Sequence, residues 1–80
     1  MTMREKTPCF VVTFHTTAEA MAAEKLCRAK GLTGRLIPVP RALTADCGVA
    51  WCAPASEGPA LREALAAAEV ETEGLYELTL

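Results

Sequence analysis

Four cysteines and one histidine are the residues of this sequence best suited to nucleophilic or soft-ligand chemistry. Cys47 differs from the other cysteines because it precedes a glycine in a stretch of mixed composition, residues 41–48, which we expect to be a loop. A cysteine reacts as its thiolate, and nearby cations or a helix N-terminus favour that form. The sequence therefore predicts Cys47 as the reactive thiol. The remaining cysteines lie in predicted strands or a helix and are expected to pack: Cys9, Cys27 and Cys52.

Four other positions are predicted to bind the partner of this thiol. Gly48 lets the backbone approach a ligand or adopt a positive φ, and Arg41 or His15 could hold an anionic group. Thr16 is expected to cap a helix whose N-terminal amides and positive dipole end point toward the loop. The plainer alternatives are that Cys47 packs at a strand start, that His15 is exposed or capping, and that Arg41 is solvated.

The elements that must position these residues follow from hydrophobic periodicity and turn residues. Large apolar residues two apart predict a first strand with Phe10, Val12 and Phe14 facing the core. Thr16 and Glu19 have the spacing of a reciprocal helix cap. The predicted elements are a strand over 9–14, a helix between 16 and 31, strands over 35–39 and 49–53, a helix from 56 to 68 and a strand over 74–80.

Apolar residues at helical spacing predict which face of each helix packs on the sheet. In the first helix, which Gly31 is expected to end, they are Ala18, Met21, Ala22, Leu26 and Ala29. In the second helix, for which Ser56 is the predicted cap, they are Leu61, Ala64, Leu65 and Ala68. Pro38 lacks an amide donor, so the strand over 35–39 is expected at a sheet edge.

The order strand, helix, strand, strand, helix, strand is that of a split βαβ domain. We therefore expect an α+β, ferredoxin-like sandwich, an antiparallel four-stranded sheet with two helices on one face. It forms one domain over residues 8–80, preceded by a flexible N-terminus at residues 1–7. The first strand is then central and antiparallel to the third. This arrangement would bring His15 toward Cys47 and the start of the first helix toward the same loop.

Trp51 lies in the nearly all-apolar run 49–53 and is expected to pack either in the core or on a face of the sheet. We favour a place on the uncovered face. There it would form a homodimer patch together with Val11, Thr13 and Leu75. Aromatic residues make up only 5% of the chain, which predicts a core of small residues in place of stacked rings.

Length and charge exclude several classes of protein. Eighty residues suffice for a single hydrophobic core. A formal net charge of -2 and a pI of about 5.3 argue against binding to nucleic acid or to an anionic membrane, since both need a cationic surface. The first apolar run is too short for a signal peptide or a membrane helix. We therefore expect a cytoplasmic protein whose cysteines stay reduced.

The run LIPVPR at residues 36–41 and the Cys47–Gly48 pair that follows it resemble the putative selenium/sulfur carrier protein-like family of small domains. The first strand ending in Phe14 and the run EGLY at residues 73–76 extend the similarity over most of residues 9–78. The resemblance implies a carrier more than an enzyme, with Cys47 holding sulfur or selenium and passing it from a donor protein to an acceptor protein. It implies no metal and no organic cofactor.

Three other functions compete with this one. A non-catalytic binding or regulatory module is compatible with the fold class. A redox switch between Cys47 and Cys52 is disfavoured, because five extended residues span about 16 Å and bridged Cα atoms lie about 4.4–6.8 Å apart. A metal site ranks last, since His15 is the sole histidine and the cysteines are not closely paired in sequence.

A group of acidic residues is expected to be solvated surface: Glu69, Glu71, Glu73 and Glu77.

Overall fold

The computed structural model describes residues 8–41, 43 and 48–79. Its elements are β1 (Pro8–Thr13), α1 (Thr17–Ala29), β2 (Arg35–Pro38), β3 (Val49–Pro54), a short 3₁₀ helix (Ala55–Glu57), α2 (Gly58–Ala67) and β4 (Gly74–Thr79). The predicted order of strands and helices is confirmed. The N-terminal residues 1–7, predicted to be flexible, lie outside the described residues.

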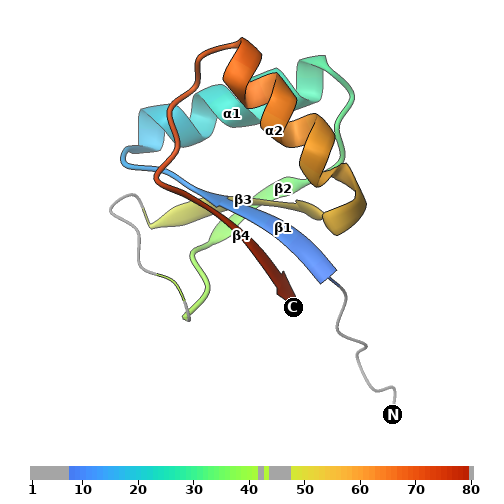
Figure 1. The fold of residues 1–80 in the computed structure, drawn as a ribbon. Coiled ribbons are helices and arrows are strands. Elements are labelled where there is room, and N and C mark those ends of the chain that lie inside the picture. The colour runs from blue at the N-terminus through green and yellow to red at the C-terminus, as the bar shows by residue number, and fades with distance from the viewer. Residues whose placement is uncertain (1–7, 42, 44–47, 80) are drawn as a thin grey trace.

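The four strands form one antiparallel sheet in the order β2-β3-β1-β4, and both helices cover the same face of it (Figure 1). This is the expected α+β, ferredoxin-like fold. Pro38 lies in β2 at the sheet edge, where its missing amide costs no ladder bond. Because Thr13 pairs with Ala50, the end of β1 lies beside the start of β3, as the topology predicts.

Aromatic rings form the centre of the core, contrary to the composition-based expectation. Three of the four aromatic residues are almost completely buried in one cluster: Phe10, Phe14 and Trp51. The strand parity predicted for β1 is confirmed, since Phe10, Val12 and Phe14 all belong to this cluster. A low aromatic percentage misleads here because a small domain needs few rings to fill its interior.

The packed face of α1 is not the predicted one. The buried residues are Ala20, Ala23 and Cys27, whereas Met21 keeps 59% of its surface exposed. Alanine occurs on both the buried and the exposed face of this helix, so periodicity alone does not select a face. The buried side chains of α1 are small, and they belong to the same core cluster as the large rings.

Trp51 faces the helices, so its predicted place on the uncovered face is wrong. Val12 is paired with Trp51 on one side and with Leu75 on the other, which puts all three on the helix-covered face. Val11 and Thr13 face the opposite side. The dimer patch built on Trp51 is therefore lost, and a homodimer through the open sheet face stays a prediction.

The start of α2 also differs from the prediction. Ser56 lies in the 3₁₀ helix and so does not cap α2. The N-cap residue of α2 is Glu57, whose side chain makes no capping hydrogen bond. The Glu57 carboxylate instead accepts a hydrogen bond of 2.8 Å from the amide of Thr33, joining α2 to the β2 side of the sheet. Leu61, Ala64 and Leu65 are buried as predicted.

Within the described part of the chain, neither helix is long and apolar enough to cross a membrane.

Gly34 leaves the space that the Trp51 indole fills. A Cβ at Gly34, where φ is +151°, would lie 2.7 Å from the indole and 2.8 Å from the Cys52 carbonyl oxygen. We predict that Gly34→Ala lowers the free energy of unfolding by about 3 kcal/mol, because overpacking adds to backbone strain. Gly31→Ala, with φ +72° and open space around it, should cost only about 1–2 kcal/mol. Equal losses for the two variants in urea unfolding would contradict this account.

Candidate functional site

The loop between β2 and β3 is closed at its base by one backbone hydrogen bond. The amide of Val39 donates to the carbonyl of Gly48 over 3.1 Å, and the amide of Leu43 donates to Pro40 within the loop over 2.9 Å. Gly48 is exposed, and its φ of +83° lies in the left-handed region. This agrees with the positive φ that the sequence allows for this glycine. The chain thus leaves the loop through an exposed, glycine-specific turn.

Arg41 and Cys47 are the cation and the reactive thiol predicted for this loop, and the structure describes only Arg41. Arg41 is exposed, and no described acidic side chain pairs with it. A role for Arg41 in binding an anion stays a prediction. Cys47 lies outside the described residues, so its approach to His15 stays a prediction.

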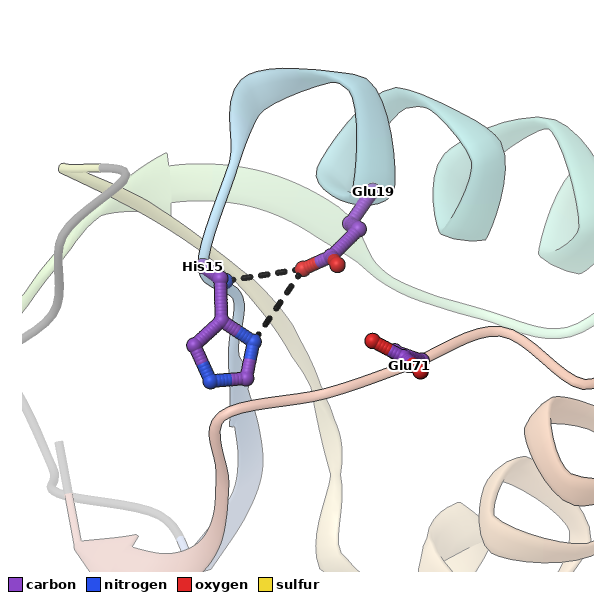
Figure 2. A group of neighbouring side chains, drawn as sticks. All are labelled: His15, Glu19 and Glu71. Atoms are coloured by element: carbon purple, nitrogen blue, oxygen red, sulfur yellow. Dashed lines mark hydrogen bonds and ion pairs between the residues drawn. The ribbon is translucent and has the colours of Figure 1, made fainter.

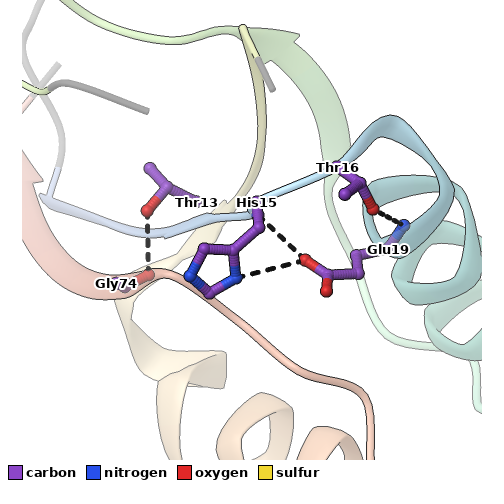
Figure 3. Close-up of polar contacts among 5 residues, drawn as sticks. All are labelled: Thr13, His15, Thr16, Glu19 and Gly74. Atoms are coloured by element: carbon purple, nitrogen blue, oxygen red, sulfur yellow. Dashed lines mark hydrogen bonds and ion pairs between the residues drawn. The ribbon is translucent and has the colours of Figure 1, made fainter. Parts of the chain in front are cut away.

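The N-terminus of α1 carries a reciprocal cap, as the sequence predicts. The Thr16 hydroxyl oxygen accepts a hydrogen bond of 3.2 Å from the Glu19 amide, and the Glu19 carboxylate accepts one of 2.8 Å from the His15 amide (Figure 3). The return bond goes to the residue before the cap instead of to Thr16 itself. Thr16 and Glu19 together thus fix the start of α1 and the direction in which His15 leaves β1.

His15 lies between two carboxylates. Its Nδ1 is 3.5 Å from an oxygen of Glu19, and one ligand atom each from His15, Glu19 and Glu71 lie within 4.8 Å of one another (Figure 2). Glu71 comes from the segment before β4. That segment is held beside β1 because the Glu73 amide donates to the Thr13 carbonyl over 2.7 Å and the Thr13 hydroxyl donates to the Gly74 carbonyl over 3.4 Å (Figure 3).

This cluster changes the electrostatics expected at the helix start. Among the described residues, Glu19 supplies a carboxylate in the first turn of α1, at the positive end of the helix dipole. Glu71 adds a second negative charge next to His15. Imidazole and carboxylate groups could hold a divalent metal, but His15 and Glu71 are exposed. Binding roles for His15 and Thr16 stay predictions, and both residues are already engaged by Glu19.

Two of the described cysteines are shifted toward the protonated thiol. Cys27 is completely buried, and its pKa is raised by that burial and by the nearby Glu57 charge. The pKa of Cys52 is raised by burial first and by its neighbour Cys9 second, with Arg35 acting in the opposite direction. Both side chains are therefore weak nucleophiles at neutral pH.

The structure also joins two cysteines that the sequence treats separately. Cys9 on β1 and Cys52 on β3 face away from the core on the same side of the sheet, and Cys9 is near enough to raise the pKa of Cys52. Arg35 on β2 is the direct cross-strand partner of Cys52. Strand parity gives the face of each cysteine, but only the β1–β3 register reveals that they are neighbours.

Removal of the α1 cap tests the role of Thr16. We predict that Thr16→Ala lowers the free energy of unfolding by about 1 kcal/mol, because the Glu19 amide loses its acceptor. Thr17→Ala, one position into the helix, is the matched control and should be nearly neutral. Urea unfolding followed by circular dichroism measures both variants. A neutral Thr16→Ala would contradict the capping role.

The surroundings of Cys52 predict its alkylation profile. Its reaction with iodoacetamide should reach half of its maximal rate above pH of about 8.5, the value of an ordinary cysteine thiol. Arg35→Ala should move that midpoint higher, since the cation favours the thiolate, and Cys9→Ser should move it lower. Arg28→Ala, which removes a cation paired with Glu24, should leave it unchanged. Peptide-resolved mass spectrometry across pH gives the midpoint, and a value below 8.5 would contradict the assignment.

Comparison with known proteins adds one finding to this geometry. The chain matches the family described as "Putative Se/S carrier protein-like" over residues 9–77. No significant match was found among curated proteins or among solved structures. The matched range runs from β1 into β4 and so includes every element of the sheet. The chain therefore belongs to the putative Se/S carrier protein-like family.

Proposed function

We propose that this protein carries sulfur or selenium on the thiol of Cys47 and passes it from a donor protein to an acceptor protein. The observation that carries the proposal is the family match over residues 9–77, with a family description that names this role. The protein acts as a carrier in this proposal, and its turnover depends on both partners. No metal or organic cofactor takes part in the chemistry.

Three features of the described residues support Cys47 as the carrier. Gly48, its sequence neighbour, is exposed and has a positive φ, so the chain next to the thiol is open to a partner protein. Cys27 is completely buried, and Cys52 has a raised pKa, which makes both poor acceptors of sulfur. Arg41 is exposed in the same loop and could pair with an anionic persulfide.

The transfer needs two thiol exchanges. In the first, the Cys47 thiolate attacks the outer sulfur of a donor persulfide, the S–S bond of the donor breaks, and the donor leaves as its thiolate. The product is a persulfide on Cys47, or the corresponding perselenide when selenium is carried. In the second exchange, an acceptor thiolate attacks the outer atom and Cys47 leaves as the thiolate. No electrons are gained or lost overall.

Loading the reduced protein from a small-molecule persulfide donor tests this proposal. We predict one added sulfur on Cys47 by intact and peptide mass spectrometry, and none on that peptide in Cys47→Ser. Cys27→Ala is the matched control and should load normally, since Cys27 is buried in the core. Arg41→Ala should slow loading several-fold and Arg41→Lys should restore most of the rate, because the charge is retained.

Two results would contradict the proposal. Normal loading and transfer by Cys47→Ser would exclude Cys47 as the carrier. Equal labelling of all four cysteines would mean that the loop does not activate its thiol. The non-catalytic binding module would then become the better interpretation.

A further inference from the structure

A second thiol site lies on the sheet face that the helices do not cover. Cys9 and Cys52 come from the two central strands and lie on the same face of the sheet, and Cys9 is near enough to raise the pKa of Cys52. Both are half-buried and line one pocket of about 360 Å³, together with Pro8, Thr33, Gly34, Arg35, Ala53 and Pro54. The pair thus lies on two central strands that are hydrogen-bonded to each other, and it is reachable from solvent.

The register disfavours a direct disulfide between them. Cys9 is opposite Pro54 and Cys52 is opposite Val11, so the two cysteines are diagonal neighbours. Diagonal Cα atoms in an antiparallel ladder lie about 7–8 Å apart, whereas bridged cysteines have Cα atoms about 4.4–6.8 Å apart. One atom placed between the two sulfurs would relieve this mismatch, because it lengthens the link without moving the strands.

We propose that Cys9 and Cys52 form a two-coordinate site for a soft monovalent metal cation of the Cu(I) type, with Arg35 beside it. Thiolates are the protein ligands that select Cu(I). Two donors suit this ion better than Zn²⁺, which takes four ligands in structural sites. Two thiolates and one Cu⁺ carry a net charge of -1, which the guanidinium of Arg35, directly across from Cys52, partly neutralises. Cys47 is not part of this site, so the proposal is independent of the carrier function.

Anaerobic titration of the reduced protein with Cu(I), against a chromogenic Cu(I) chelator, tests the site. The wild-type chain should remove one equivalent from the chelator. Cys9→Ser and Cys52→Ser should each weaken Cu(I) binding by more than about a hundredfold. Substitution of a residue that only supports a metal ligand already lowers metal affinity by about 10–100-fold, and these substitutions remove a ligand itself. Arg35→Ala should weaken it about tenfold. Cys27→Ala and Cys47→Ser should bind as the wild type does.

X-ray absorption of the Cu(I)-loaded wild-type protein gives a second readout that needs no variant. Two sulfur ligands are expected. Failure of the wild type to compete, or equal loss of binding in Cys47→Ser and Cys9→Ser, would overturn the proposal. A Cys9–Cys52 disulfide that persists in a reducing glutathione buffer would also overturn it, because the thiols would then be consumed.

Discussion

The burial of Trp51 with Phe10 and Phe14 between the sheet and the helices is the interaction on which the rest of this structure depends. Each ring removes on the order of 150–250 Å² from water, which at roughly 25 cal/mol per Å² contributes about 4–6 kcal/mol. Trp51 Nε1 has no hydrogen-bond partner among the described residues, at a cost of about 1–3 kcal/mol. The indole is still strongly stabilising, and it selects a glycine at position 34 because a Cβ there would overlap the ring.

The same packing determines where polar and reactive groups lie. Side chains alternate along a strand, so a register that buries Phe10 and Trp51 must turn Cys9 and Cys52 to the opposite face. It also pairs Thr13 with Ala50, which brings the start of α1 to the sheet end where the β2–β3 loop returns at Gly48. The places of the Cys9–Cys52 pair and of the described ends of the β2–β3 loop are thus consequences of one register.

These environments suit different chemistry. Around Cys52, burial and a second thiol oppose ionisation, and the raised pKa favours a proton that a soft cation would displace. At the other end of the sheet, Gly48 and Arg41 are exposed, and the carboxylates of Glu19 and Glu71 gather around His15. Among these described residues, His15 is engaged by Glu19, whereas Arg41 has no described acidic partner.

The sequence by itself determined the order of elements, the fold class, the buried parity of β1, the edge position of β2 and the Thr16–Glu19 cap, because each depends on residues close together in the chain. It did not determine the buried face of α1, since alanines occur on both the buried and the exposed face of that helix. Nor did it determine the side on which Trp51 lies, since an all-apolar strand shows no alternation of apolar and polar residues. The contacts of Cys9 with Cys52 and of Glu71 with His15 join residues more than forty positions apart. Only tertiary structure decided these, because strand register and helix docking set such distances, and both depend on packing of the whole core.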